Sequence, residues 1–218
     1  MTDRIMIVVA AGHSIRFGAD KLMTSVAGRP LVAHTVAAVV DHADQVILVC
    51  REDQIAALDE LDLGVVLVPG GPSRTASEMA GLSAIGGPAR LIGIHDGARP
   101  LVPSHLTEAL YETAAEFGGA IPLTNPSRAL VQKTDLSVVN GAFFAQTPQV
   151  FEGEALLAAY VSAARIDYEG QDTAEIARKF SELEIRGVPG DPANIKVTHP
   201  EDIELVTALL EISHNEPQ

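Results

Sequence analysis

The chain has 218 residues, 47% of them hydrophobic and 20% charged, with a formal net charge of −14 at pH 7. This composition is typical of one folded domain and excludes disordered and collagen-like chains. The apolar runs are shorter than the ~18 residues of a membrane span, and a pI near 4.8 argues against binding nucleic acid or anionic membranes. Residues 1–6 lack the basic segment of a secretory signal, and the single cysteine, Cys50, favours a reducing compartment. We therefore expect a single domain over residues 1–218 in the cytoplasm.

Strand-like apolar runs alternate with helical patterns along the chain. The predicted strands are Arg4–Ala11, Gln45–Arg51, Gly64–Pro69, Ala89–His95, Gly118–Pro122 and Ser181–Val188. The predicted helices are Pro30–His42, Asp53–Leu61, Arg74–Ile85, Ser104–Phe117, Gly153–Arg165, Asp172–Phe180 and Pro200–Ile212. This alternation indicates βαβ units on a mostly parallel sheet with both faces covered, so the predicted fold class is α/β, a three-layer sandwich.

The segment from Leu123 to Gln149 does not fit the alternation. It contains residues that break regular structure and two short β-prone runs, around Leu130 and Val138. We interpret it as a β-hairpin that leaves the sheet, and not as a separate domain.

The loop after the first strand reads "AAGHSIRFGADK". Ala10, Ala11 and Gly12 leave backbone groups uncovered, and such amides can hold phosphates or a base edge. Arg16 and Lys21 are suited to a triphosphate, as a planar fork and a mobile point charge. The spacing of the glycines departs from the dinucleotide fingerprint and from the P-loop. A solvated turn with ordinary surface cations explains this segment about equally well.

The loop after the third strand reads "PGGPSRTASEMAGL". Gly70 and Gly71 permit close approach of a ligand to the backbone, and Ser77 lies near the start of the next helix. A tight turn with Ser73 as helix N-cap explains the glycines about as well.

The loop after the fourth strand reads "IHDGARPLVP". Asp96 at a strand's carboxyl end can hold a ribose hydroxyl or a metal, and Arg99 can hold a phosphate. The alternative is an Asp–Arg pair that only shapes the loop. His95 has no partners at metal-ligand spacing and is interpreted as strand-end packing.

Lys196 lies in "NIKVTHPED", within a strand-like apolar run just before the last predicted helix. A lysine in such a run can simply point outward by strand alternation. It is also placed to reach an anionic ligand at the same sheet edge.

Together, five segments resemble the 2-C-methyl-D-erythritol 4-phosphate cytidylyltransferase family. They are "AAGHSIRFGADK", "GGPSRTAS", "HDGARP", "AQTPQVF" and "ANIKVTHPED", in the family's order. The resemblance implies a Rossmann-like nucleotidyltransferase fold, usually homodimeric, in which a hairpin arm reaches the partner; that arm would span about residues 123–145. It also implies CTP and a polyol phosphate as substrates, pyrophosphate as a product, and Mg²⁺ as the cofactor.

The resemblance further implies roles for individual residues. Arg16 and Lys21 would hold the triphosphate and stabilise the charge that develops on the α-phosphorus, and Lys196 would position both phosphates for attack. The nucleotide would be bound by Ala10, Ala11, Gly12, Gly70, Gly71, Ser77 and Asp96. Asp96 would also lie near the metal, which the phosphates of CTP mostly hold, and the acceptor substrate would contact Arg99 and Thr147.

The departures from the family pattern lie in the arm. Asn125 and Pro126 stand where the family has an Asp-Thr pair, and Val139 stands where it has an arginine for the acceptor phosphate. Arg128 or Lys133 is a candidate replacement for that arginine. A transferase for another polyol phosphate, such as ribitol 5-phosphate, is therefore an alternative, as is a nucleotide-binding protein without turnover.

Overall fold

The structure, a computed structural model, describes residues 2–12, 17–18, 20–126, 130, 132–134 and 137–215. The elements in chain order are β1 (Thr2–Val9), β2 (Ser25–Val26), β3 (Arg29–Pro30), α1 (Leu31–Ala37), η1 (Val40–His42), β4 (Gln45–Cys50), η2 (Glu52–Gln54), α2 (Ile55–Asp59), β5 (Val66–Pro69), α3 (Arg74–Ser83), β6 (Ala89–Asp96), α4 (Ser104–Phe117), β7 (Gly118–Thr124), β8 (Phe144–Ala145), β9 (Gln149–Glu152), α5 (Gly153–Ala164), α6 (Thr173–Phe180), β10 (Glu184–Pro189) and α7 (Glu201–Asn215).

The central sheet is mostly parallel. Its strands follow the order β10-β7-β9-β6-β1-β4-β5, and β8 pairs with β7 off this path. β1 runs parallel to β4 and β6, β4 to β5, and β7 to β10. β9 runs antiparallel to its neighbours β6 and β7. The predicted α/β fold class is confirmed.

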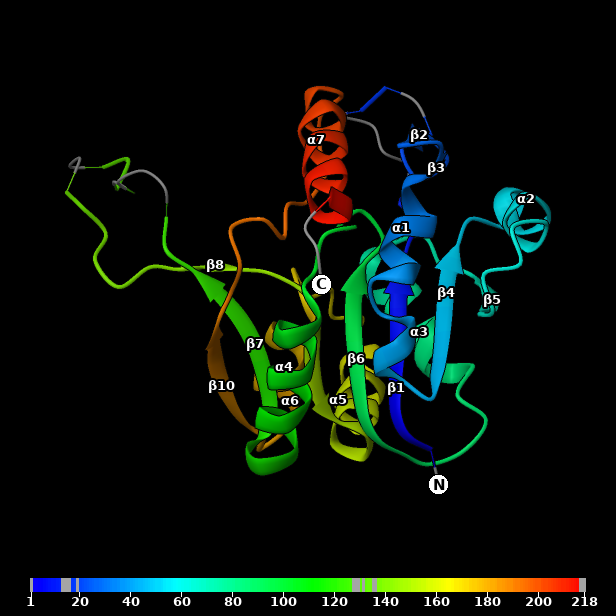
Figure 1. Ribbon diagram of the computed structural model, residues 1–218. Helices are drawn as coiled ribbons and strands as arrows, with labels where there is room; N and C mark the ends of the chain where they lie inside the picture. The colour runs from blue at the N-terminus through cyan, green and yellow to red at the C-terminus, as the bar shows by residue number, and fades with distance from the viewer. Residues whose placement is uncertain are drawn as a thin grey trace.

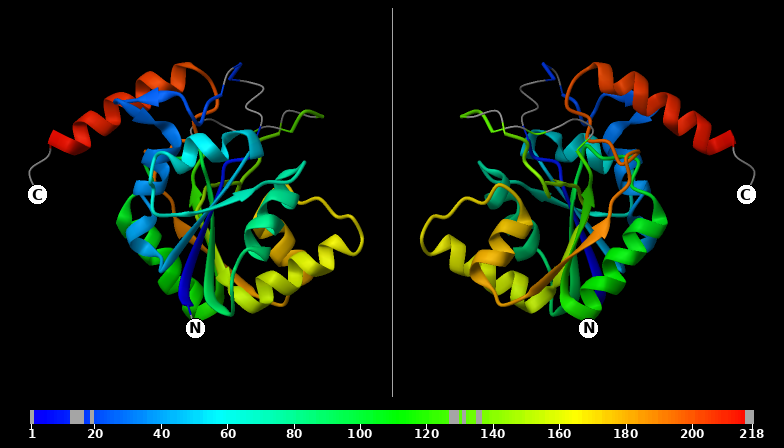
Figure 2. Two further views of the ribbon diagram at one scale, coloured as in Figure 1. Left: turned by 90° about the vertical axis from the view of Figure 1, so that its right-hand side faces the viewer. Right: turned by 90° about the vertical axis from the view of Figure 1, so that its left-hand side faces the viewer.

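Side chains along β1 alternate between two cores. Met6 and Val8 pack with residues of α1 and α4 on one face of the sheet. Ile5 and Ile7 pack with residues of α3, α5 and α6 on the other face. Because strand side chains have a period of two, this continuously apolar strand supplies both faces. Figures 1 and 2 show the resulting three layers, with the sheet between the two groups of helices.

Several element boundaries differ from the sequence predictions. The strand predicted over Gly64–Pro69 begins at Val66, and the one predicted over Ser181–Val188 covers Glu184–Pro189. The helix predicted over Pro30–His42 ends at Ala37, because Val39 has φ −125° and a short 3-10 helix follows. The region of Asp53–Leu61 is likewise divided between η2 and α2.

Two differences concern the second half of the chain. Strand β9 was not predicted, and it fills the gap between β6 and β7. The strand-like run around Lys196 is a loop, in which the Val197 amide donates a single backbone hydrogen bond (2.9 Å) to the carbonyl oxygen of Ala98.

The arm leaves the sheet at the end of β7 and returns as β8. Leu123 pairs with Ala145 and Thr124 with Phe144, in antiparallel register. Farther out, the amide of Val139 donates to the carbonyl oxygen of Leu130 over 2.7 Å. Figure 1 shows the described part of the arm extending away from the body of the molecule. This region is therefore a hairpin excursion as far as the structure describes it.

The carboxyl ends of the parallel strands define one edge of the molecule. The arm, the β2–β3 hairpin and α7 lie at this edge in Figure 1. Within the described ranges, no helix combines the length and the hydrophobicity that a membrane crossing requires.

Candidate active site

A cavity of about 450 Å³ opens at the carboxyl ends of the parallel strands. Four chain segments that are remote in sequence form its wall. The lining residues are Val9, Ala10, Ala11, Gly12, Phe17, Lys21, Leu22, Gly71, Pro72, Ser73, Arg74, Ser77, Asp96, Gly97, Ala98, Lys196 and Thr198. This is the edge at which ligands bind in open α/β sheets.

Close backbone packing joins the first glycine loop to the loop before α3. A Cβ atom on Gly70 would overlap the Cβ of Ala11 and lie 3.0 Å from Oγ of Ser77. The Ser77 hydroxyl donates to the carbonyl oxygen of Ser73 (2.8 Å) and accepts from the amide of Gly71 (3.2 Å). Ser77 therefore fixes the shape of the second loop, and only glycine at position 70 lets the two loops meet.

Ser73 is the N-cap of α3, as the structural alternative for this loop predicted. The hydroxyl of Ser73 accepts a hydrogen bond (3.0 Å) from the amide of Ala76. The turn thus has a structural role, while Gly71 and Ser77 still line the cavity.

Asp96, at the end of β6, is the centre of a group of cations. Nη1 of Arg74 lies 2.7 Å from Oδ1, and Oδ2 lies 3.1 Å from Nε of Arg99 and 2.9 Å from Nζ of Lys196. Burial alone would raise the pKa of Asp96, but Arg74, Lys196 and Arg99 together hold it well below its usual range. Asp96 is therefore a carboxylate, and we call Lys21, Arg74, Arg99 and Lys196 the cation cluster.

A chain of hydrogen bonds behind the cavity holds Asp96 in place. The amide of Asp96 donates to Oγ1 of Thr147 (3.0 Å), whose hydroxyl lies 3.0 Å from Nδ1 of His95. Nε2 of His95 lies 3.0 Å from the carbonyl oxygen of Arg99. A carbonyl oxygen only accepts, so Nε2 carries the proton and Nδ1 accepts from Thr147.

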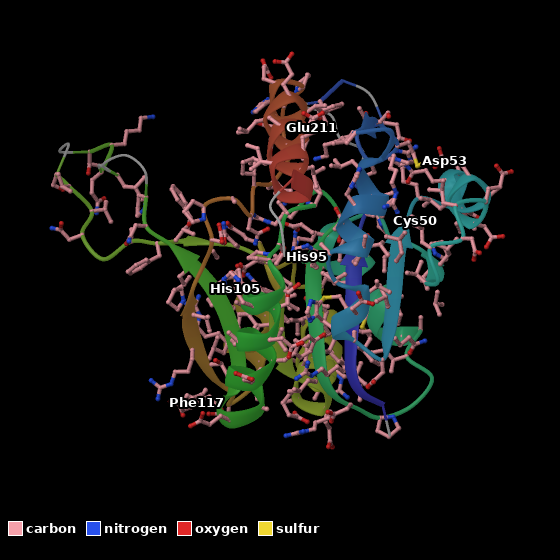
Figure 3. All side chains as sticks on the ribbon, in the orientation of Figure 1. Cys50, Asp53, His95, His105, Phe117 and Glu211 are labelled. Atoms are coloured by element: carbon pink, nitrogen blue, oxygen red, sulfur yellow. The ribbon has the colours of Figure 1, made fainter. Side chains whose placement is uncertain are left out.

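His95 is neutral in this chain. It is fully buried, and burial lowers its pKa to about 4. Figure 3 labels His95 near the end of β6, within the layer of the sheet. The prediction that His95 packs at the strand end is confirmed.

The loop that carries Lys196 connects the segments around the cavity. Nζ of Lys21 donates to the carbonyl oxygen of Val197 over 2.8 Å. Nη1 of Arg99 donates to the carbonyl oxygen of Asn194, also over 2.8 Å. The C-terminal loop thus brings Lys21 and Lys196 to the same cavity.

The predicted site residues fall into four groups. Arg16 lies outside the described residues. Arg99 and Thr147 lie behind the cavity wall, where the Thr147 hydroxyl is engaged by Asp96 and His95, so it offers no free contact to an acceptor substrate. Gly70 supports the wall and borders a neighbouring hollow. The other predicted residues line the cavity: Ala10, Ala11, Gly12, Lys21, Gly71, Ser77, Asp96 and Lys196.

Arg74 is a candidate site residue that the sequence reasoning missed. It lines the cavity and contacts Asp96 from the first turn of α3. It lies in the segment "GGPSRTAS", of which the sequence prediction used only the glycines and serines. An arginine in the first turn of a helix that follows a phosphate-type loop was the available signal.

The surroundings of Asp96 do not fit a resident metal ion. Both of its carboxylate oxygens already face cations. Among the described residues, no three His, Cys, Asp or Glu side chains are grouped as metal ligands. In this conformation the cations that line the cavity therefore favour a negatively charged ligand over a metal ion.

The fold and the cavity define a class of protein, one that binds a phosphorylated ligand at the carboxyl edge of a three-layer α/β sandwich. The 2-C-methyl-D-erythritol 4-phosphate cytidylyltransferase family model matches residues 4–212 of the chain. The 2-C-methyl-D-erythritol 4-phosphate cytidylyltransferase of Cereibacter sphaeroides is 40% identical in an alignment of 225 positions, which covers 95% of this chain and 96% of that protein.

Two further proteins extend the comparison. The bifunctional enzyme IspD/IspF of Desulforudis audaxviator is 34% identical over 96% of this chain, and the match spans only 57% of that longer protein. The crystal structure of 2-C-methyl-D-erythritol 4-phosphate cytidylyltransferase from Thermus thermophilus superposes with a TM-score of 0.82 at 30% identity, over 97% of this chain and 100% of that one. This chain therefore belongs to the 2-C-methyl-D-erythritol 4-phosphate cytidylyltransferase family.

Proposed function

We propose that this protein transfers the cytidylyl group of CTP to 2-C-methyl-D-erythritol 4-phosphate, releasing pyrophosphate, as a step in isoprenoid precursor synthesis. The product is 4-diphosphocytidyl-2-C-methyl-D-erythritol. The observation that carries the proposal is that the family match spans every segment of the cavity wall, from Val9 to Thr198.

The reaction requires charge stabilisation more than proton transfer. A phosphate oxygen of the acceptor attacks the α-phosphorus of CTP, and the bond from that phosphorus to the oxygen bridging the α- and β-phosphates breaks, with the electron pair leaving on pyrophosphate. A phosphate monoester has a second pKa of about 6, so it is already an anionic nucleophile at neutral pH. The protein's task is to bring two anions together and to offset the charge that builds up.

The positive charges of Lys21 and Lys196 support the assignment of that task to them. Both line the cavity, from opposite ends of the sequence. We assign to them, together with Arg16, the stabilisation of the triphosphate and of the pentavalent α-phosphorus. Asp96 is assigned to the ribose, and Ala10 to Gly12 with Gly71 and Ser77 to the nucleotide.

We infer that magnesium reaches the site on the triphosphate of CTP. Asp96 is paired with cations, and the described residues provide no separate group of metal ligands. Bound Mg²⁺ neutralises phosphate charge, and none of the residue roles above depends on it.

We also propose that the protein acts as a homodimer through the arm. Exposed apolar side chains gather on the described part of the arm: Val138, Val139, Phe143 and Phe144 are 57%, 37%, 53% and 50% exposed. A group of apolar side chains on an extended hairpin is typical of a surface that another chain covers. A cytoplasmic location stays a prediction from the composition of the chain.

The test is a turnover assay with purified protein, CTP, Mg²⁺ and a panel of alcohol phosphates, in which pyrophosphate release is followed. We expect turnover with 2-C-methyl-D-erythritol 4-phosphate. Turnover only with ribitol 5-phosphate would refute the proposed acceptor and support the alternative polyol phosphate. CTP binding without turnover on any acceptor would refute the enzyme and support a nucleotide-binding protein.

A further inference from the structure

A buried carboxylate lies directly behind the cavity and has no part in the chemistry above. Glu78 is on α3, one helical turn after Arg74, and only 1% of its surface is exposed. It does not line the cavity. A buried carboxylate is costly to desolvate unless it is paired and hydrogen-bonded, so its partners indicate what it does.

Glu78 is held by two other helices of the same layer. Its Oε2 accepts a 2.6 Å hydrogen bond from the hydroxyl of Tyr160 on α5. Its Oε1 accepts a 3.0 Å hydrogen bond from the hydroxyl of Thr173 at the start of α6. Tyr160 and Thr173 are themselves almost fully buried, at 1% and 0% exposure. The carboxylate is thus fixed by groups that belong to the core and not to the site.

Arg74 connects this fixed carboxylate to the site. Its Nε lies 2.9 Å from Oε1 of Glu78 as an ion-pair contact, and its Nη1 donates to Oδ1 of Asp96 over 2.7 Å. A planar guanidinium between two carboxylates has its direction set by both. Burial alone would lower the pKa of Arg74, but Asp96 and Glu78 together raise it, so the arginine stays charged.

Glu78 and Asp96 both contact Arg74, and the orientation of the guanidinium depends on both contacts. Asp96 also receives Arg99 and Lys196 on its other oxygen. Without the charge of Glu78, Arg74 would keep its ion pair with Asp96 but lose the second carboxylate that orients the guanidinium. Asp96 and the cavity-facing part of Arg74 would then shift relative to the bound nucleotide.

We propose that Glu78 is a positioning residue for CTP binding, which fixes Arg74 and through it the carboxylate of Asp96. This inference rests on the proposed function, because it names CTP as the ligand of the cavity. It assigns no contact with substrate to Glu78 itself.

The test is a double-mutant cycle on the dissociation constant for CTP, measured by titration calorimetry without any acceptor. Glu78→Gln keeps the volume but removes the charge and one of the two acceptor oxygens, and we expect it to raise the Kd for CTP about tenfold. In an Asp96→Asn background the same change should raise the Kd by less than about twofold, since coupled residues are not additive. An equal tenfold loss in both backgrounds, or no loss in either, would overturn the inference.

Two further variants keep the result interpretable. Glu108→Gln removes a carboxylate on α4 that is 41% exposed and is paired with Arg4 and His42, away from the cavity, and its Kd for CTP should match the wild type. If Glu78→Gln does not fold, Thr173→Val removes one hydrogen bond to Glu78 and should raise the Kd about threefold only when Asp96 is present. A Thr173→Val protein with unchanged affinity would refute the proposal in that case.

Failure of the proposed function has a different signature. Wild-type protein that binds no CTP would refute the function and this inference together. Wild-type protein that binds CTP normally, with Glu78→Gln equally competent, would refute the inference alone.

Discussion

The cation cluster and the arm lie at the same edge of one sheet but are built in opposite ways. Around Asp96, the ion-pair contacts are short, and the residue is 5% exposed. In the described part of the arm, Phe143 and Phe144 are half-exposed, and the backbone is paired with β7 only at its base. One region is complete within a single chain, whereas the other presents surface that the chain itself does not cover.

This contrast agrees with where the sequence departs from the family pattern. Lys21, Arg99 and Lys196 lie in the segments that carry the resemblance, whereas the departures inferred from it, Asn125, Pro126 and Val139, all fall in the arm. The nucleotide side is constrained by many simultaneous contacts, and a change to one of them disturbs several others. The described part of the arm is paired with the sheet only through β8, so we expect substitutions farther out to cost the monomer little.

The largest effect is expected from Lys21→Ala. Loss of a cation that stabilises the transition state should reduce kcat by about 10³-fold, with little change in the unfolding midpoint. Steady-state kinetics and thermal denaturation measure the two quantities. Lys179→Ala, on α6 with its Nζ over the ring of Tyr168, is the matched control and should keep wild-type rates. Wild-type kcat in Lys21→Ala would remove the proposed role of the cluster.

Gly70→Ala should lower the free energy of unfolding by about 2 kcal/mol, because the new Cβ overlaps Ala11 and crowds Ser77. Urea denaturation measures the loss, and the Kd for CTP should rise with it. Gly87→Ala, whose Cβ meets no described atom within 4 Å, should change neither quantity. Equal stabilities of the two variants would mean that the loops do not pack as described.

His95 should give the nucleotide side a pH dependence. The unfolded chain takes up a proton near pH 6.5, whereas burial keeps His95 neutral in the folded protein down to about pH 4. Between pH 6.5 and about 5, the free energy of unfolding should therefore fall by about 2 kcal/mol as the pH falls.

The control for this prediction is the variant His95→Gln. Burial raises the pKa of Glu78, which acts in the opposite direction, so the difference between wild type and His95→Gln isolates the histidine. Urea titrations at both pH values measure it. If the free energy of unfolding changed equally with pH in the two proteins, the prediction that His95 is buried and neutral would be wrong.

The smallest effect on nucleotide binding is expected from the arm. Phe143→Ser combined with Phe144→Ser should shift the protein to monomers in sedimentation experiments, because both side chains are half-exposed in the isolated chain. The Kd for CTP should stay within about twofold of wild type, since affinity changes of distant sites are independent. A loss of CTP affinity equal to that of the cluster variants would show that the two regions are coupled.

Much of the fold was predictable because β1, β4 and β6 are buried on both faces and read as continuous apolar runs. Strand β9 was missed because Gln149–Glu152 is only four residues long and its pairing depends on β6 and β7, which are remote in sequence. Propensity within a short window does not report such partners.

The site was predictable where a residue follows a strand and not where its role depends on tertiary contacts. Asp96 and Lys21 were found from their places after strands, and Lys196 from its place just before the last predicted helix. Thr147 was found from the resemblance to the family, but only the structure shows that its hydroxyl is used by Asp96 and His95. The pair Arg74 and Glu78 has the helical spacing i, i+4, which was visible in the sequence and was overlooked.

The hydrogen bond from Lys21 to the carbonyl of Val197 spans 176 positions of the chain. A site with such high contact order exists only after the whole domain has folded, because no local fragment contains even half of it. Affinity for CTP is thus a measure of global native structure, and the ligand stabilises only the fully folded state. At a CTP concentration of 100 times Kd, this linkage should add about 2.7 kcal/mol to the free energy of unfolding.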